Sequence, residues 1–172
     1  MSTMPKVSVV TTTYNDMDNL CRIMEEVRKQ TYKNIEHIIV DGGSTDGTVE
    51  MLTRLSEEQP GAFRWISEPD DGIYDAINKG LKLCTGGTCF DHFADETVLA
   101  RMVEIMEREG TDGVHGDLCY MDGDRVVRKW HQGQGHIRSG WMPGHPTLYL
   151  RKEVYDSYGY YRTDYRISGD YE

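Results

Sequence analysis

Short apolar runs alternate with longer amphipathic segments along the first half of the chain. Three runs are rich in β-branched or aromatic residues and bounded by turn residues, which predicts strands at 7–12, 36–40 and 63–66. The segments that follow them repeat apolar residues three and four positions apart, which predicts helices at 17–30, 48–58 and 72–83. This alternation predicts the α/β class: a mostly parallel sheet flanked by helices, half of a doubly wound arrangement.

The pattern is less regular beyond residue 87. We expect a strand at 88–93, a helix at 96–108, a strand at 113–120 and a turn at 121–124 that leads into an antiparallel hairpin strand at 125–130. Glycine and histidine are frequent at 131–146, which predicts a loop or lid. A short strand at 147–150 and a helix at 152–158 follow. No repeat or linker divides the chain, so we expect a single domain at 1–172.

The composition narrows the function classes. The 172 residues carry 19 basic and 29 acidic side chains, and a net charge of −10 argues against a nucleic-acid surface. The four cysteines show no paired spacing, which predicts buried thiols rather than disulfides or a zinc site. We find no signal-peptide pattern and no apolar run of membrane-spanning length. These features predict a cytoplasmic location, with peripheral contact at the inner face of the membrane left open.

One turn in this pattern carries chemistry. The apolar residues 38–40 stop at Asp41, and the glycine-rich segment 42–48 then opens a helix that Ser44, Thr45 or Asp46 can cap. Open α/β sheets bind ligands at the carboxyl ends of their strands, so Asp41 is a candidate ligand contact. The alternative is a capped turn without a ligand, and the pattern alone leaves both open.

Four motifs in the first eighty residues resemble a known family. They are VSVVTTTYN at 7–15, QTYKNIE at 30–36, VDGGSTDGT at 40–48 and SEPDDGIYDAINKG at 67–80. Together they resemble the opening of family 2 glycosyltransferases with the GT-A fold. The last motif is closest to a bacterial branch that builds exopolysaccharides, such as the colanic acid glycosyltransferases. The resemblance implies a nucleotide-sugar-binding half at 1–95 and an acceptor half, with its short hairpin, at 96–172.

The resemblance implies transfer of a sugar from a nucleotide-diphosphate sugar, a UDP-sugar for a uracil-like base, to an acceptor hydroxyl with inversion. It implies that Thr13 and Tyr14 contact the nucleotide and that Asp41 accepts a hydrogen bond from an N–H of the base. Read without the resemblance, Tyr14 is as well explained as a half-buried ring, and Asp46 is better explained as a helix cap.

The resemblance also places Asp71 at the nucleotide end of the cleft. Asn78 and Lys79 follow on the next helix, and the charge of Lys79 can offset that of the diphosphate. The plain alternatives are a helix cap at Asp71 and a solvated side chain at Lys79, while Asp75 is expected on the polar face of that helix.

A divalent metal, Mg²⁺ or Mn²⁺, is the cofactor that the GT-A resemblance implies, since it stabilises the leaving diphosphate. The acidic motif of the family falls at 91–96, DHFADE, where Asp95 aligns and is the candidate metal and substrate ligand. Glu96 replaces the second acid of the family, and Phe93 stands where a polar residue is usual. His92 is a chemically suitable ligand, although a packed or exposed histidine is the simpler interpretation.

The acceptor half carries the remaining expectations. ISGDYE at 167–172 matches the short motif that holds the catalytic base of the family, which makes Asp170 the candidate base. GHPT at 144–147 makes His145 a candidate contact to the diphosphate or acceptor. Further candidates, each with an equally plain structural interpretation, are Asp117 for the acceptor pocket and Trp130 and Trp141 for stacking on a sugar.

The sequence ends two residues after Asp170, which predicts a fragment or a truncated acceptor half. The leading hypothesis is an inverting glycosyltransferase that acts on a glycan or lipid-linked acceptor in cell-surface polysaccharide biosynthesis. An inactive nucleotide-sugar-binding module is the alternative, favoured by Phe93 and by the short acceptor half. A receiver-like signalling domain is a third, which predicts no nucleotide binding.

Overall fold

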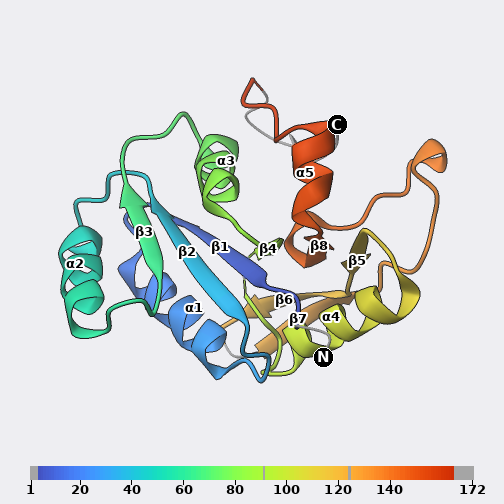
Figure 1. Cartoon of the computed structure of the whole chain (residues 1–172), viewed down its shortest axis with the longest axis horizontal. Helices are drawn as coiled ribbons and strands as arrows, with labels where there is room; N and C mark the ends of the chain where they lie inside the picture. Colours follow the sequence, from blue (N-terminus) through green and yellow to red (C-terminus); the bar gives the residue numbers. More distant parts are fainter. Residues whose placement is uncertain (1–3, 91, 124, 165–172) are drawn as a thin grey trace.

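A six-stranded sheet lies at the centre of the computed structural model, which describes residues 4–90, 92–123 and 125–164 (Figure 1). The strand order is β3-β2-β1-β4-β8-β5. The parallel strands are β1 (Val7–Thr13), β2 (Ile35–Asp41), β3 (Arg64–Ser67) and β4 (Gly87–Phe90). β8 (Leu148–Leu150) runs antiparallel to both β4 and β5 (Gly113–His115). β5 therefore ends at the same edge of the sheet as the parallel strands, and we call this the carboxyl edge.

Helices cover both faces of the sheet. α1 (Met17–Lys29), α2 (Thr48–Glu58) and α4 (Val98–Glu109) lie on one face, and α3 (Ile73–Leu83) and α5 (Lys152–Tyr158) lie on the other (Figure 1). Alternation along β1 explains this: Val9 packs into the cluster formed with α1 and α4, and its neighbour Val10 into the cluster with α3 and α5. A strand buried on both faces reads as a continuous apolar run, which is the pattern of residues 7–10.

α3 packs unusually close to the sheet at Gly80. A methyl group at this position would lie 2.4 Å from Cγ1 of Val10, which is shorter than any normal carbon contact. The absence of a side chain therefore sets the distance between α3 and β1, and with it the position of the loop that precedes α3.

A two-stranded hairpin stands apart from the sheet. It consists of β6 (Leu118–Asp122) and β7 (Arg125–Trp130), which pair antiparallel with a register shift between Tyr120 and Met121. Most of its side chains are exposed.

The expected α/β fold with a mostly parallel sheet and a short hairpin is confirmed, and the ranges of α2 and α5 match the expected ones. The expected single strand at 113–120 was wrong. The Gly116 N–H still donates to the Thr147 carbonyl (3.3 Å), in register with β8, and the chain then leaves the sheet as Asp117 turns toward the end of β7, where it accepts from the Gln132 N–H. β4 also ends at Phe90, three residues earlier than expected.

The cysteines agree only in part with the expectation of buried thiols. All four are free, and Cys84 and Cys89 are buried, but Cys21 is exposed on α1 and Cys119 is half-buried in the hairpin. None of the helices within the described ranges combines the length and apolar character needed to cross a bilayer.

Candidate functional site

Asp41 lies at the carboxyl edge, at the end of β2, and its side chain is fully buried. Its Oδ2 accepts hydrogen bonds from the N–H groups of Gly43 (3.1 Å) and Ser44 (3.0 Å) and from the hydroxyl of Ser67 (2.6 Å). Its Oδ1 accepts from the Ser44 hydroxyl at 2.5 Å. A carboxylate offers about four acceptor positions, so the turn after β2 and the end of β3 saturate this one.

The loops after β1 and β2 are joined by reciprocal hydrogen bonds. The Asn15 N–H donates to the Ser44 hydroxyl (2.7 Å), and the Thr45 N–H donates to Oδ1 of Asn15 (2.7 Å). Asn15 has a left-handed backbone, with φ of 50°, which asparagine tolerates better than most residues. Because Ser44 also contacts Asp41, the two loops form one unit at the carboxyl edge.

Asp46 contacts the beginnings of two helices, although the N-cap residue of α2 is Gly47 and not Asp46. Its Oδ1 accepts from the N–H (3.1 Å) and hydroxyl (2.6 Å) of Thr48 in α2, and its Oδ2 accepts from the N–H of Met17 in α1 (3.2 Å). The Thr48 hydroxyl, as the main cause, lowers the pKa of the Asp46 carboxyl from its ordinary value. The negative charge suits the positive ends of both helix dipoles.

Thr13 and Tyr14 lie at the end of β1, next to this unit. The Thr13 hydroxyl oxygen is buried and has no hydrogen-bond partner among the described residues. A buried polar atom without a partner costs free energy, so this hydroxyl is available to a water or to a ligand. Tyr14 beside it is 64% exposed, and such an exposed aromatic ring can stack on a planar ligand.

Gly42 lies between the Tyr14 ring and the Asp70 carboxylate. A methyl group at Gly42 would lie 2.6 Å from Oδ2 of Asp70 and 3.3 Å from Cδ2 of Tyr14. Asp70 is held in place by its other oxygen, which accepts from the Gly72 N–H at 2.9 Å. The absence of a side chain at Gly42 therefore leaves room for the Asp70 carboxylate and the Tyr14 ring beside the main chain.

Asp71 in the loop before α3 and Lys79 within α3 differ in their contacts. The Asp71 side chain is exposed, and its carboxylate makes no hydrogen bond within the described ranges, so it does not cap α3. Lys79 forms ion pairs with Glu68 (3.1 Å) and Asp75 (3.2 Å) and donates to the Pro69 carbonyl (2.7 Å). Its charge is already compensated by two carboxylates, so its first role is to hold this loop.

Asn78 and His145 meet at Tyr161 rather than at the nucleotide loops. The Asn78 amide donates to the Tyr161 carbonyl (2.7 Å) and accepts from the Tyr161 N–H (3.0 Å). The His145 ring meets the Tyr161 ring edge-on, with centroids 5.3 Å apart. Tyr74 and Tyr155 complete this aromatic cluster. Asn78 therefore links α3 to the chain that follows α5.

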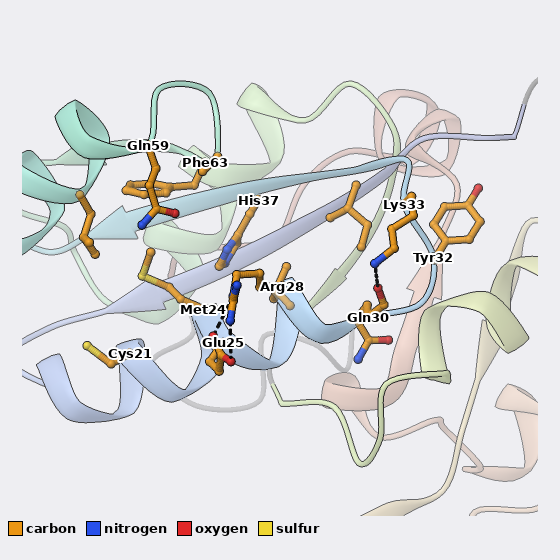
Figure 2. A pocket seen from close by; sticks show the side chains of 14 residues that line it. Cys21, Met24, Glu25, Arg28, Gln30, Tyr32, Lys33, His37, Gln59 and Phe63 are labelled. Carbon is orange, nitrogen blue, oxygen red and sulfur yellow. Dashed lines mark hydrogen bonds and ion pairs between the residues drawn. The ribbon is translucent and has the colours of Figure 1, made fainter.

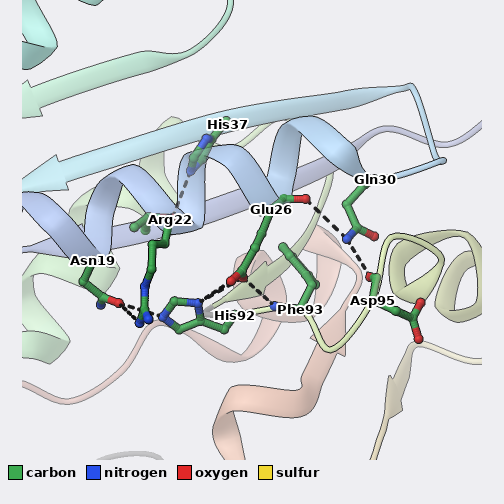
Figure 3. Close-up of polar contacts among 9 residues, drawn as sticks. Asn19, Arg22, Glu26, Gln30, His37, His92, Phe93 and Asp95 are labelled. Atoms are coloured by element: carbon green, nitrogen blue, oxygen red, sulfur yellow. Dashed lines mark hydrogen bonds and ion pairs between the residues drawn. The ribbon is translucent and has the colours of Figure 1, made fainter. Parts of the chain in front are cut away.

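Asp95 lies at the end of the sheet opposite to Asp41. After β4 the chain runs beside α1 toward its carboxyl end, with His92 against Glu26 and Asn19 (Figure 3). The Gln30 amide donates to the Asp95 carbonyl (2.9 Å), and Gln30 lies just before the start of β2. The structure thus does not bring Asp95 together with Thr13, Tyr14 and Asp41.

The side chain of Asp95 is also occupied. Its Oδ1 accepts from the hydroxyl (2.6 Å) and N–H (2.8 Å) of Thr97, and its Oδ2 pairs with Arg101 (2.9 Å). The Thr97 hydroxyl, as the main cause, lowers the pKa of the Asp95 carboxyl. The ring of Phe93 packs against the core cluster of α1 and α4.

The described residues contain no group of three or more histidine, cysteine or acidic side chains arranged to hold a metal ion. At Asp95 the nearest charged partner is the cation Arg101, so this position does not fit Mg²⁺ or Mn²⁺. Asp170, the expected base, lies outside the described residues.

A cavity of about 520 Å³ lies between α1 and α2, away from the carboxyl edge (Figure 2). It is bounded by the later turns of both helices and by the start of β2. His37 faces it from β2, and burial lowers the pKa of this histidine to about 4, so the ring is neutral at pH 7. The ring also lies 2.9 Å from the Thr11 hydroxyl.

The chain belongs to the glycosyltransferase family 2, whose family description matches residues 8–166. Among solved structures, S. aureus TarS 1-349 in complex with UDP matches with a TM-score of 0.76 and 17% identity, over 96% of this chain and 53% of that one. The mannosyltransferase PcManGT from Pyrobaculum calidifontis, in complex with GDP-Man and Mn²⁺, matches with a TM-score of 0.71 and 20% identity, over 95% and 49%. These matches identify the fold as GT-A.

Sequence relatives agree with the family. An uncharacterized glycosyltransferase of Mycobacterium tuberculosis (strain ATCC 25618 / H37Rv) is 40% identical over 116 residues, which cover 64% of this chain and 43% of the relative. A PGL/p-HBAD biosynthesis glycosyltransferase of Mycobacterium bovis (strain BCG / Pasteur 1173P2) is 26% identical over 184 residues, 98% of this chain and 68% of the relative. The chain spans less than half the length of the first of these. Neither description mentions colanic acid or another exopolysaccharide, so the expected closeness to that branch is not confirmed.

Sequence reasoning missed part of the Asp41 network. Ser67 pairs with Asp41 across the β2–β3 ladder, and Asp70 reaches Gly42 three residues later. The signal for Ser67 was its place at the end of the strand next to β2, since neighbouring parallel strands end side by side.

Proposed function

We propose that this chain binds a nucleotide-diphosphate sugar, specifically a UDP-sugar, at the carboxyl edge, and that the sugar is transferred to an acceptor hydroxyl with inversion. A glycan or lipid-linked glycan is the acceptor that we propose, in cell-surface polysaccharide biosynthesis at the cytoplasmic face of the membrane. The observation that carries this proposal is the buried, unpartnered Thr13 hydroxyl beside the exposed Tyr14 ring, in a chain of this family.

The base of the nucleotide stacks on the exposed Tyr14 ring in this proposal. The Thr13 hydroxyl then gains the partner that it lacks among the described residues. An exposed ring at the mouth of a loop is a suitable platform because every base presents a π face.

Asp41 supports the site in two ways. Its four accepted hydrogen bonds hold the turn that carries Gly42 and Ser44. If an N–H of the base is to donate to this carboxylate, one of the two hydroxyl donors, Ser44 or Ser67, must release it. Both hydroxyls can rotate, whereas the two backbone donors cannot, so the exchange is confined to the serines.

The negative charge of the diphosphate needs a cation that the side chains of the donor half do not readily supply. Asp70 and Asp71 are acidic, and Lys79 is paired with two carboxylates. A divalent cation between the diphosphate and the exposed Asp71 would compensate these charges, and carboxylate oxygen is a ligand that Mg²⁺ and Mn²⁺ accept. We therefore propose Asp71 rather than Asp95 as the acid that faces a metal-bound diphosphate.

A thermal-shift series tests this function. UDP, GDP, ADP and CDP are added to the chain with and without Mn²⁺, and the unfolding midpoint is followed in each case. We expect UDP to raise the midpoint, and we expect Tyr14→Ala to remove most of the rise. The matched control is Tyr158→Ala, because Tyr158 is 89% exposed at the end of α5 and touches none of the loops of the site. No rise with any nucleotide would overturn the proposal.

A nucleotide-sugar-binding module without turnover is the second candidate. The observation that favours it is the placement of Asp95 beside the carboxyl end of α1, away from Thr13, Tyr14 and Asp41. Formation of UDP from a UDP-sugar separates the two candidates. The enzyme forms UDP over many turnovers, whereas the module binds the UDP-sugar and forms no UDP.

A further inference from the structure

The hairpin of β6 and β7 gathers exposed apolar side chains. Ten large apolar side chains are exposed in the part of the chain that the structure describes, and four of them lie here, 41–52% exposed: Tyr120, Met121, Val126 and Val127. Met121 and Val126 are opposite each other in the ladder, so they share one face of the hairpin. A two-stranded hairpin is marginally stable alone in water, and an apolar cluster on its surface is typical of a docking site.

The strand β7 is also basic, although the chain is acidic. Residues 125–129 read RVVRK, which places three cations and no acid within five residues. Arg128 and Lys129 form no ion pair with a described residue, and the Arg128 guanidinium lies 5.4 Å from the centroid of the Tyr120 ring. Arg125 lies 3.8 Å from one of the two aspartates of the turn. With both aspartates counted, the hairpin carries a net charge of +1, and the other residues together carry −11.

Hydrogen bonds fix the base of the hairpin. Asp117, just before β6, pairs through Oδ2 with Nδ1 of His131, just after β7 (2.7 Å), and its Oδ1 accepts from the Gln132 N–H (3.1 Å). The Gln132 side chain is buried and donates to the Gly116 carbonyl (2.7 Å) and the Thr147 hydroxyl (2.9 Å). The hairpin therefore projects from a fixed base, and a surface that binds it is held in a defined orientation to the sheet.

This base lies on the acceptor half of the carboxyl edge. β5 ends there at His115, and β6 begins three residues later at Leu118. The nucleotide loops lie on the same edge, at the ends of β1 and β2. An acceptor that is anchored in a membrane has to present its hydroxyl near this edge, so a membrane contact next to β5 is suitably placed.

We propose that the hairpin docks the chain on an anionic lipid bilayer. Met121, Val126 and Val127 enter the headgroup region, while Arg128 and Lys129 pair with the phosphates of anionic lipids. Charge supports this choice of partner, because the hairpin is positive while the rest of the chain is negative, so an anionic surface favours approach by the hairpin. The docking goes beyond the proposed function, since it does not require a bound nucleotide.

Co-sedimentation with vesicles tests this docking. We expect the chain to sediment with vesicles of phosphatidylglycerol and phosphatidylcholine in equal parts, but not with vesicles of phosphatidylcholine alone, and we expect high salt to weaken the binding. Arg128→Gln with Lys129→Gln is expected to weaken it about 25-fold, since each cation near such a surface contributes about fivefold. The matched control is Arg54→Gln with Arg108→Gln, which removes the same charge from exposed sites on α2 and α4.

A second variant tests whether the apolar side chains enter the lipid. Val126→Trp places an indole at an exposed position of the hairpin, and indole rings settle at the interface between membrane and water. When anionic vesicles are added, we expect its fluorescence to shift to shorter wavelength by more than that of the parent chain. The control is Ile105→Trp, an exposed position on α4, for which we expect no shift beyond that of the parent.

Each contrary result overturns the docking. Vesicle binding that survives the loss of both cations, or that is as strong without phosphatidylglycerol, excludes the hairpin or the anionic lipid as the contact. Val126→Trp fluorescence that shifts no more than the parent shows that the apolar side chains stay out of the lipid. A chain that binds no vesicles overturns the proposal, and dimers that the hairpin changes dissociate would make a second copy the partner. UDP binding is measured separately by thermal shift, so failure of the docking leaves the proposed function untouched.

Discussion

Replacing Asp41 by asparagine tests how the nucleotide loops are held. Asparagine keeps an oxygen for the three donors at Oδ2, which are the N–H groups of Gly43 and Ser44 and the Ser67 hydroxyl. It removes the charge, however, and each of these hydrogen bonds falls from about 1.5–3 kcal/mol to about 1 kcal/mol. Its NH₂ group replaces Oδ1, so the Ser44 hydroxyl must rotate and accept. The summed loss is about 3 kcal/mol of unfolding free energy.

For a chain of this length a loss of 1 kcal/mol lowers the unfolding midpoint by about 2–4 °C, so we expect Asp41→Asn to melt roughly 6–12 °C below the parent. Thermal unfolding followed by circular dichroism measures this. Asp71→Asn is the matched control, because Asp71 is an exposed acid at the same edge whose carboxylate accepts no hydrogen bond from the described residues, and we expect a change within about 0.5 kcal/mol. An Asp41→Asn midpoint within about 2 °C of the parent would refute the four-bond network as the element that holds this turn.

Three further predictions concern packing, pH and the acidic motif. Gly80→Ala places a methyl group 2.4 Å from Cγ1 of Val10, and we expect a loss of about 1–3 kcal/mol in urea denaturation; an unchanged midpoint would show that α3 is not in close contact with β1. His37 has a pKa of about 4 in the folded chain, below its unfolded value of about 6.5, so the unfolded chain binds the proton more readily. The contribution of His37 to the free energy of unfolding is therefore complete above about pH 6.5 and decreases toward pH 4, by about 2 kcal/mol between pH 7.5 and pH 5. We expect His37→Gln to remove this decrease when the free energy of unfolding is measured against pH. Asp95→Ala removes the contacts to Thr97 at the start of α4 and is expected to lower the free energy of unfolding by about 0.5–2 kcal/mol. We expect UDP binding in the presence of Mn²⁺ to stay unchanged, and weaker binding by calorimetry would show that Asp95 belongs to the nucleotide site.

The donor half of the fold was predictable because its signals are local. A buried strand on both faces gives a continuous apolar run, and β1 and β2 show one. The motif at 40–48 identified Asp41 at a strand end before any contact was known. What it did not show is that Ser67, 26 residues later, completes the hydrogen bonding of that carboxylate, because strand pairing brings the two together.

The acceptor half was less predictable because its contacts join distant segments. Asp95 aligned with a family acid, but β4 ends at the level of Val10 in β1, and the chain then turns back along α1. The strand that begins at Gly113 ends where Asp117 turns to the Gln132 N–H, 15 residues away, and no local pattern marks this point. The same holds for Asn78, whose partner Tyr161 lies 83 residues away.

The most direct test of the central claim is a titration of the ¹⁵N-labelled chain with UDP, followed by amide chemical shifts. We expect the shifts to gather at 13–15, 41–45 and 70–72, which line the carboxyl edge around Tyr14. Amides at 55–63, beside the cavity between α1 and α2, should stay unchanged. Shifts confined to the cavity, or no shifts at saturating UDP, would contradict a nucleotide-sugar site at the carboxyl edge.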